Sequence, residues 1–501
     1  MDHILQGFLM ALTPYNIIYL LLGCVVGLIV GVLPGLGPIF GVALFLPLTF
    51  SLPVDTSLIL LTAIYAATAY GDGITSILLN VPGGPSGVAI TFDGYPLAQQ
   101  GKAGMAMGAL ACSALVGDML GVLALATIAP LLANFALKIG PAEYFLLTIF
   151  GLSMVSMIGK GKGQVFKGLV LGCFGLAISF VGRDVITGVT RYNFGFMYLE
   201  DGIPFISACI GLFALSQIFI MAEKGDMRIT GENALVTQPW EGVKATFKNW
   251  FATVRGAGVG IFMSMIPGIG ITTASLMAYL VQERTARDRE TYGKGNICGV
   301  IAPQAAANAT TGGELIPALS LGIPSGPTSA IFIAALTLHG LRPGLQFFTS
   351  GGNEAYSLFA GMFLAAIVFF IIGITCTPLF ARVTKIPNAL LVPIIGILCF
   401  AGSFALRNML EDLIVTVIFG VIGYFLFKYD WPIACMILGL ILGPLAESNF
   451  QRAMTISEGS YGIFLGSPVA VAMMSVIVAM VAWTFLGDSF KKMRSKMRDK
   501  G

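Results

Sequence analysis

The sequence has little charge. Only 11% of its 501 residues are charged, against about 25% in an average soluble domain. By contrast 56% are hydrophobic, and the mean hydropathy is +0.88. A soluble chain this apolar could not cover its surface with polar groups, so the composition excludes an ordinary soluble protein.

The sequence is also poor in the residues and motifs of several chemistries. It has two His, and its eight Cys form no CxxC pair; scattered in apolar stretches, they are expected to be small buried hydrophobes. No phosphate loop, nucleotide fold or metal-ligand cluster is recognisable, so we expect no bound cofactor. The alternating ten-residue segments of a membrane β-barrel are missing, and the N-terminus has no basic cluster typical of a cleaved signal peptide.

Long apolar runs are abundant instead, and several reach the roughly 20 residues that a membrane-spanning helix needs. The clearest are Tyr15–Val32, Ala103–Leu115, Phe205–Ala222, Ser357–Ile374, Ile386–Phe400, Leu413–Phe427 and Ser467–Leu486. We therefore predict an all-α polytopic membrane protein with about ten to twelve membrane segments, some of them broken.

Polar stretches divide this chain. We expect a first transmembrane repeat over residues 1–222, a central polar linker over 223–249, and a second repeat over 250–460. Residues 461–501 should form a last membrane helix and a basic tail. Because basic residues stay on the cytoplasmic side, the C-terminus is expected inside.

The two halves resemble each other. Gly31-Val-Leu-Pro-Gly-Leu-Gly37 matches Ser264-Met-Ile-Pro-Gly-Ile-Gly270. Gly71-Asp72 followed by Pro82-Gly-Gly-Pro85 matches Gly313-Glu314 followed by Pro324-Ser-Gly-Pro327. Later, Gly172 and Gly175 align with Gly420 and Gly423. Three matches in one order indicate an internal duplication.

The charges of two equivalent loops predict opposite orientations for the repeats. Lys160, Lys162 and Lys167 make the loop of the first half basic, whereas Arg407, Glu411 and Asp412 make its counterpart acidic. Under the positive-inside rule such loops lie on opposite sides of the membrane. Inverted-topology repeats are typical of secondary transporters.

Each half contains two Gly/Pro interruptions within apolar sequence, at Pro34–Gly37, Asn80–Ser86, Pro267–Gly270 and Gly322–Thr328. Broken backbone in a membrane is tolerated where it lines a cavity or a ligand site, and paired interruptions indicate a solute site near the midplane. We expect the tips of two re-entrant hairpins to meet there and to bind a carboxylate solute. The candidate solute-binding residues are Asn80, Pro82, Gly83, Gly84, Ser86, Pro324, Ser325, Gly326 and Thr328.

A second set of residues is expected to bind or couple an ion, sodium or a proton. Exposed carbonyls and hydroxyls suit a cation, and carboxyl groups inside a membrane are functional by default. The candidates are Gly35, Gly37, Asp72, Gly268, Gly270, Thr272, Asn308 and Glu314. Asp118 is a third acid in apolar sequence, and its role stays open.

The order of these motifs resembles the large membrane subunit of tripartite tricarboxylate transporters, over roughly residues 15–460. The motifs are GVLPGLGP, YGDGITSILLNVPGGPSG, DGYPLAQQGKAG, PGIG, GVIAPQAAANATTGGELIPALSLGIPSGP and HGLRPG. The resemblance implies a secondary transporter in the bacterial inner membrane, driven by an ion gradient, with sodium as the expected ion. It implies two partners, a small four-helix membrane subunit and a periplasmic solute-binding protein, and leaves a homodimer open. It also implies an elevator motion of the hairpin-bearing domain.

Two other functions compete with transport of a small carboxylate. Gly84-Pro85-Ser86-Gly87 fits the GxSG of intramembrane serine proteases, with His339 as the base. However, Pro-Ser-Gly recurs at Pro324–Gly326, as a structural motif would. A passive channel is the other alternative, although duplicated broken helices suit alternating access better. We therefore expect a transporter and not an enzyme.

Overall fold

The computed structural model describes residues 2–33, 35–136, 139–156, 162–184, 186–224, 238–266, 269–349, 352–376 and 388–479. Several predicted features lie outside these ranges, namely Pro34, Lys160, Pro267, Gly268, part of the central linker and the basic tail. Seven described helices are long and apolar enough to cross a membrane, and five further apolar helices are shorter. The prediction of an all-α polytopic membrane protein is confirmed.

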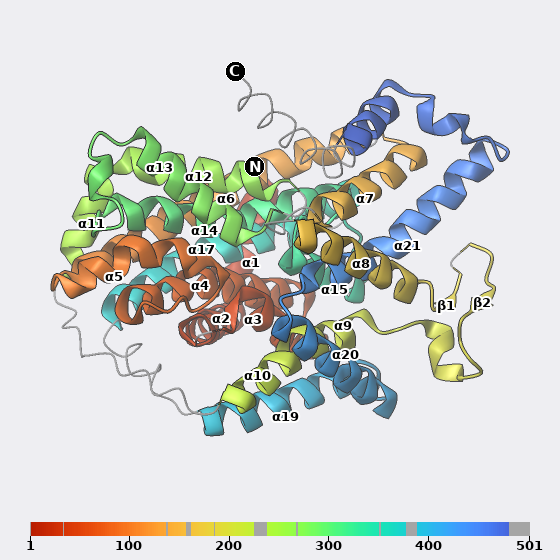
Figure 1. The fold of residues 1–501 in the computed structure, drawn as a ribbon, viewed down its shortest axis with the longest axis horizontal. Coiled ribbons are helices and arrows are strands. Elements are labelled where there is room, and N and C mark those ends of the chain that lie inside the picture. The colour runs from red at the N-terminus through yellow and green to blue at the C-terminus, as the bar shows by residue number, and fades with distance from the viewer. Residues whose placement is uncertain are drawn as a thin grey trace, which may run out of the picture. The chain divides into compact units, whose positions relative to one another are not determined.

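The chain forms two compact units, each drawing on both halves of the sequence: unit 1 comprises Met1–Asn134 and Ile206–Phe425, and unit 2 comprises Phe135–Phe205 and Leu426–Gly501. The first-half helices centred on unit 1 are α1 (Asp2–Ala11), α2 (Pro14–Val32), α3 (Gly37–Phe45), α4 (Val54–Leu79), α5 (Thr91–Gln99), α6 (Ala103–Ala136), α9 (Phe205–Cys209) and α10 (Ser216–Lys224). Those of the second half are α11 (Pro239–Lys248), α12 (Trp250–Ser264), α13 (Ile271–Thr285), α14 (Cys298–Leu321), α15 (Pro327–Leu338), α16 (Leu345–Thr349), α17 (Gly352–Thr375), α19 (Asn388–Arg407) and α20 (Leu410–Lys428). Figure 1 labels most of these elements.

Unit 2 contains α7 (Pro141–Ser156), α8 (Lys162–Ser179) and α21 (Ile433–Ile456). Strands β1 (Gly182–Arg183) and β2 (Thr190–Arg191) form a short antiparallel hairpin after α8. Gly175 of α8 lies so close to α21 that a Cβ there would meet the Met436 carbonyl and the Gly439 Cα atom. The glycine therefore permits close packing of two membrane helices.

A glycine stripe brings α2 against α4. Gly23, Gly27 and Gly31 recur every fourth residue, and Cβ atoms there would collide with α4 at successive turns, near Ala63, Ala67 and Gly71. Because the contact positions rise together along both helices, α2 and α4 run parallel. Small residues at this spacing let membrane helices approach closely, and the stripe can be read in the sequence.

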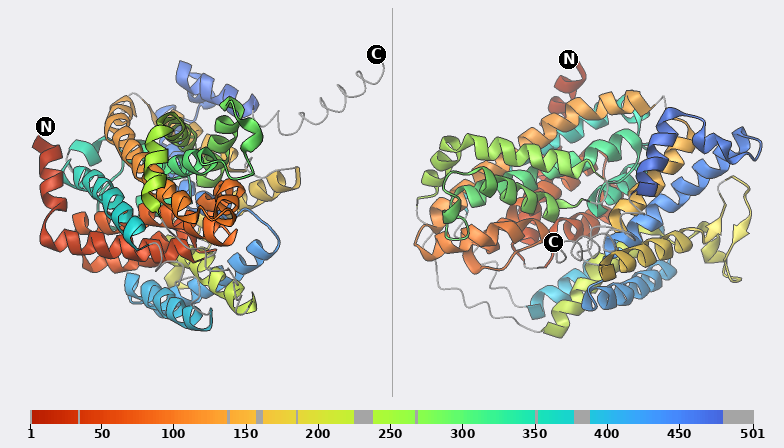
Figure 2. Two further views of the ribbon diagram at one scale, coloured as in Figure 1. Left: turned by 90° about the vertical axis from the view of Figure 1, so that its left-hand side faces the viewer. Right: turned by 45° about the horizontal axis from the view of Figure 1, so that its top comes forward.

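The second half repeats this pairing. Gly256 and Gly260 of α12 meet Ala302 and Ala306 of α14, again with positions that rise together. In Figures 1 and 2 α12, α13 and α14 lie side by side.

The helices α4 and α14 contact each other in the opposite sense. Tyr65 of α4 bonds to Glu314, whereas Ala69, one turn later, accepts from Gln304, ten residues earlier in α14. Contact positions fall along α14 as they rise along α4, so these two buried helices are antiparallel.

Candidate functional site

The first hairpin tip begins where α4 ends. Asn80 adopts a left-handed conformation with φ 56° and ends α4, and its side chain is exposed. The chain then turns back, so that Gly83 N donates to the Asp72 carbonyl oxygen at 3.1 Å. After Gly84, which is extended, the 3₁₀ segment η2 (Pro85–Ile90) begins. The tip therefore folds back onto the helix from which it came.

The second tip repeats this path with the same spacing. Gly322, eight residues after Glu314, has φ 70° and ends α14, as Asn80, eight residues after Asp72, ends α4. Gly326, twelve residues after the acid, is extended like Gly84, and α15 begins next to it. Pro324, Ser325 and Gly326 are buried.

The broken region between α2 and α3 contacts the first tip directly. Gly35 has φ 91°, and its N–H donates to the Gly83 carbonyl oxygen at 2.6 Å. Gly37 has φ 50°, and a Cβ there would lie 2.8 Å from Cδ of Pro85. The structure thus brings these two ion-site candidates against the solute-site candidates of the first half.

The corresponding break before α13 is partly described. Gly270 precedes α13, where a Cβ would meet nothing within 4 Å, and Thr272 lies in the first turn of that helix. On the same helix Ser275 Oγ donates to the Ser86 carbonyl oxygen at 3.2 Å. Hence α13 of the second half packs against the tip of the first half.

Each predicted acid belongs to the helix before its tip, but its side chain lies beside the first turn of the helical segment that follows the tip. Asp72 is fully buried, and its Oδ2 accepts from both the backbone N–H (3.3 Å) and the hydroxyl of Ser86, in the first turn of η2. Glu314 lies against the residue that precedes α15, because a Cβ on Gly326 would be 3.0 Å from Glu314 Oε1. Helix N-termini attract anions, and here the carboxyl groups of Asp72 and Glu314 occupy these positions.

The serine hydroxyls of both tips make their hydrogen bonds inside the protein. Ser86 Oγ lies 3.2 Å from the Ala69 carbonyl oxygen as well as against Asp72, and Ser325 Oγ donates to the Glu314 carbonyl oxygen at 3.0 Å. Both serines have no exposed surface. The sequence alone placed these hydroxyls toward the solute, whereas in this structure each one stabilises its own tip.

One stretch of α4, from Tyr65 to Ala69, contacts both tips. Ser86 lies at Ala69, one turn from Tyr65, whose hydroxyl donates to Glu314 Oε2 at 3.0 Å and also interacts with Thr328. Tyr65 was missed because nothing in the sequence indicates which acid a buried tyrosine will contact.

The amide candidate Asn308 lies where α4 and α14 cross. Its Nδ2 donates to the Ala66 carbonyl oxygen at 3.2 Å, and its Oδ1 accepts from Gln304 Nε2 at 2.6 Å. Three buried oxygens nearby have no hydrogen-bond partner among the described residues: Oδ1 of Asp72, Oε1 of Gln304 and Oδ2 of Asp118. Within the described ranges, no group of three or more His, Cys, Asp or Glu could hold a metal ion.

The Ser–His pair of the protease alternative is not assembled in this structure. His339 Nε2 lies 3.4 Å from Thr49 Oγ1, and its ring stacks on Phe50. Ser86 Oγ is instead engaged by Asp72 and Ala69.

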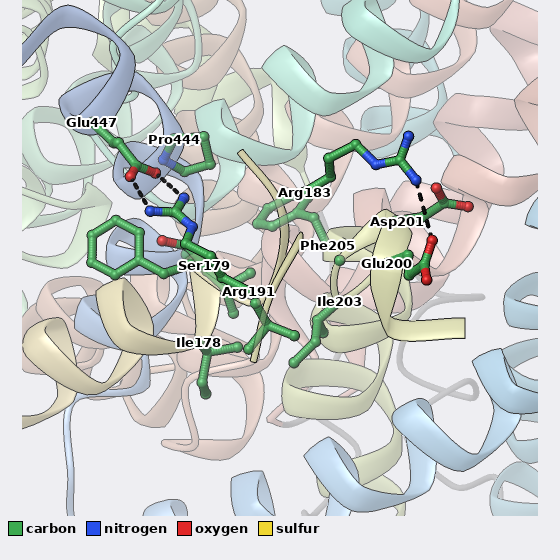
Figure 3. Close-up of a pocket in the computed structure, with 14 residues that line it drawn as sticks. Ile178, Ser179, Arg183, Arg191, Glu200, Asp201, Ile203, Phe205, Pro444 and Glu447 are labelled. Carbon is green, nitrogen blue, oxygen red and sulfur yellow. Dashed lines mark hydrogen bonds and ion pairs between the residues drawn. The ribbon is translucent and has the colours of Figure 1, made fainter. Parts of the chain in front are cut away.

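Unit 2 has a cavity of its own, with a volume of about 390 Å³, beside the β1–β2 hairpin (Figure 3). Arg191 in its wall donates to both carboxylate oxygens of Glu447, at 2.6 and 2.9 Å, and Arg183 pairs with Glu200. With Asp201, the wall of the cavity contains three acidic and two cationic side chains. This balance of charge does not favour an anionic solute.

The hairpin beside that cavity is held by Asp184. Its carboxylate accepts from the backbone N–H groups of Thr187 (2.7 Å) and Ile186 (2.8 Å) and from the Gln451 side chain (3.0 Å). These bonds, led by that of Thr187, hold the pKa of Asp184 well below its usual range because they favour the charged form. The role of this cluster is to attach the hairpin to α21.

The sequence is similar to those of known proteins. The sequence profile of the "Tripartite tricarboxylate transporter TctA family" matches residues 17–438. An Agrobacterium vitis protein described as "Uncharacterized 52.8 kDa protein in TAR-I ttuC' 3'region" is 34% identical over 502 residues, covering 98% of this chain and 97% of its own. Another from that organism, "Uncharacterized protein in TAR-II ttuC' 3'region", is 31% identical over 217 residues, covering 43% of this chain and 90% of its own.

Proposed function

The chain belongs to the tripartite tricarboxylate transporter TctA family, and on that premise we propose that it transports a small di- or tricarboxylate by coupling to a cation gradient. The observation that carries this proposal is the pair of hairpin tips, each with a buried acid at the beginning of its second helix. The donors at the tips that bind a carboxyl group of the protein are also suited to bind a carboxyl group of the solute.

The proposed complex has three kinds of subunit. Membership of a tripartite family implies that this multi-pass membrane subunit works with other subunits. We propose a small four-helix membrane subunit and a periplasmic solute-binding protein as these partners, in a bacterial inner membrane with the C-terminus inside. A homodimer of the large subunit is compatible with this arrangement.

Competition for the tip donors supplies the mechanism. Ser86 gives Asp72 one N–H and one hydroxyl, which are the kinds of donor that a solute carboxylate needs. When a cation or proton neutralises Asp72, these donors become available without leaving a buried charge unpaired. The solute would then bind along Asn80–Ser86, with Gly322–Thr328 as the second half-site and Glu314 as its acid.

Alternating access would follow from two inverted repeats. The antiparallel contact of α4 with α14 supports inversion, because they are equivalent helices of the two halves. By their order in the two halves, α1 corresponds to α11 and α6 corresponds to α17. Each of the two short helices packs on the long helix of the other half: α1 on α17, and α11, through Gly242, on α6. In the elevator motion that we propose, the elements around the tips move together as one body.

The alternatives have less support. The family is one of transporters, and the serine of the GxSG motif serves the tip, so a protease function has no assembled site. A passive channel would need neither the paired acids nor the repeated tips.

The first prediction concerns energy coupling. We expect uptake of labelled citrate or succinate into proteoliposomes holding all three subunits to require an imposed sodium or proton gradient and to survive ATP depletion. The reason is that gradient energy enters through the neutralised acids. Liposomes without the large subunit are the control, and uptake indifferent to both gradients would exclude secondary transport.

The second prediction concerns topology. On a cysteine-free background, Gly163→Cys at the beginning of α8 should react with an impermeant thiol reagent from the cytoplasmic side. Leu410→Cys, at the beginning of α20, should react from the periplasmic side, because the two loops are equivalent in an inverted repeat. Labelling of both residues from one side would show that the repeats are not inverted.

A further inference from the structure

Asp118 is a buried acid that the proposed solute site does not use. It lies on α6, has no exposed surface, and brings its Oδ1 to 2.5 Å from Thr311 Oγ1 of α14. Its Oδ2 has no hydrogen-bond partner among the described residues. An ionised carboxylate in a membrane protein is costly unless it is paired, so this environment calls for an explanation.

The hydrogen bonds around Thr311 are one hydrogen short for an ionised Asp118. Thr311 Oγ1 lies 2.5 Å from Asp118 Oδ1 and 2.6 Å from the Asn308 carbonyl oxygen. A carboxylate and a carbonyl only accept, and a hydroxyl donates one hydrogen. Both contacts are satisfied when Asp118 is protonated, since the acid then donates to Thr311 and Thr311 donates to Asn308.

Within the described ranges, no cationic side chain acts on Asp118. The titratable groups that face it are Cys24 of α2 and Tyr65 of α4, and its other polar neighbour is the Asn308 amide. The ion pairs found in the described residues join other side chains. The neutral acid is therefore the form that this environment fits.

A row of polar side chains leads from Asp118 to the first tip. Thr311, Asn308 and Gln304 lie three and four residues apart, on one face of α14. Gln304 Nε2 donates to Asn308 Oδ1 at 2.6 Å. Its Oε1, which has no hydrogen-bond partner among the described residues, lies beside Gly73, where a Cβ would be 2.9 Å away. Gly73 follows Asp72 in α4. The row thus connects α6 with the helix that carries the tip's acid.

We propose that Asp118 is the site of the coupling proton, and that the Thr311–Asn308–Gln304 row links its charge to the first tip. One proton from water on one side of the membrane converts the carboxylate to the acid, and the same proton leaves to water on the other side. In the ionised state the Thr311 hydroxyl turns from the Asn308 carbonyl to Asp118. This inference rests on the proposed secondary transport and selects the proton as its driving ion.

The test has a part that needs no solute. Infrared difference spectra of the purified protein between low and high pH should contain the C=O stretching band of a buried carboxylic acid. Asp118→Asn, which resembles the neutral acid in shape, should remove one component of that band, since Asp72 and Glu314 are buried acids as well. Ser113→Ala is the matched control, because Ser113 lies buried on the same helix and, among the described residues, donates to the carbonyl oxygens of Ala109 and Leu110. A spectrum unchanged by Asp118→Asn would overturn the proposal.

The second part measures coupling in proteoliposomes with all subunits. In Asp118→Asn, citrate or succinate accumulation driven by a pH gradient should fall about 10-fold or more, within the range of typical coupling energies. Solute exchange without a gradient should stay within about twofold of the wild type, because the solute site is intact. Thr311→Val should shift the pH dependence of uptake, and Thr311→Ser should restore it.

The outcomes separate this inference from the proposed function. A wild-type complex that exchanges neither solute, or responds to no gradient, would contradict the proposed function. A complex that responds to sodium alone, or an Asp118→Asn variant still driven by protons, would contradict the role of Asp118 only.

Discussion

Gly83→Ala will lower the rate of transport by about 100-fold while the protein still inserts into the membrane. A Cβ at this position would collide with the Gly31 carbonyl oxygen and would lie 2.9 Å from the Asp72 Cα atom. Both obstacles are backbone, so no side-chain rotation can relieve them. Gly83 also accepts from Gly35 N at 2.6 Å and donates to the Asp72 carbonyl, so the methyl group would displace the whole tip.

The expected loss is large. Overpacking in a closely packed region costs about 1–3 kcal/mol and occasionally more, and about 3 kcal/mol corresponds to a factor of roughly 150 in an equilibrium. We therefore expect the initial rate of citrate or succinate uptake, per amount of inserted protein, to fall by about 100-fold.

Gly258→Ala is the matched control for this prediction. Gly258 lies in α12, and a Cβ there would meet nothing within 4 Å, so this variant should transport at the wild-type rate. If Gly83→Ala also transports normally, the contact between the α2–α3 break and the tip is dispensable, and the solute site must be sought elsewhere.

The breaks at both tips could be predicted from the sequence because Gly and Pro act locally. Asn80 and Gly322 end their helices in left-handed conformations, and Gly84 and Gly326 are both extended, each at the same distance from its acid. Such torsions are preferences of the residue types themselves.

The partners of the acids could not be predicted in the same way. Asp72 engages Ser86, fourteen residues on, whereas Glu314 engages Tyr65 from the other half of the chain. The match between the repeats predicts similar positions for these two acids, but their hydrogen bonds depend on which helix crosses nearby. The two tips therefore share a backbone path but differ in their side-chain networks.

The division of the chain into units was also beyond sequence reasoning. Helix α8 pairs with α21 through Gly175 and Gly439, more than 250 residues apart, whereas α20 uses Gly420 and Gly423 against Leu215 and Leu212. The glycine pattern indicates that these helices pack closely, but it does not say with which partner.

Asp72→Asn and Ser86→Ala will be strongly non-additive, whereas Glu314→Gln and Ser325→Ala will combine additively. Ser86 donates its N–H and hydroxyl to the Asp72 carboxylate, so removal of either side chain removes one shared interaction. Ser325 instead donates to the Glu314 backbone carbonyl, which Glu314→Gln leaves in place. The second pair is therefore a control, because it makes the same types of substitution, acid to amide and serine to alanine, at the equivalent positions of the other tip.

We expect a coupling energy of about 1–2 kcal/mol in the first cycle, within the range for residues in contact, and a value near zero in the second. This corresponds to a deviation from additivity of roughly 5–30-fold in apparent solute affinity, measured by exchange in proteoliposomes for all four proteins of each cycle. If the solute contacts both serine hydroxyls directly, each Ser→Ala will instead weaken affinity by a similar factor whether or not the acid is present. Equal coupling in the two cycles would show that Asp72 does not compete with the solute for the donors of Ser86.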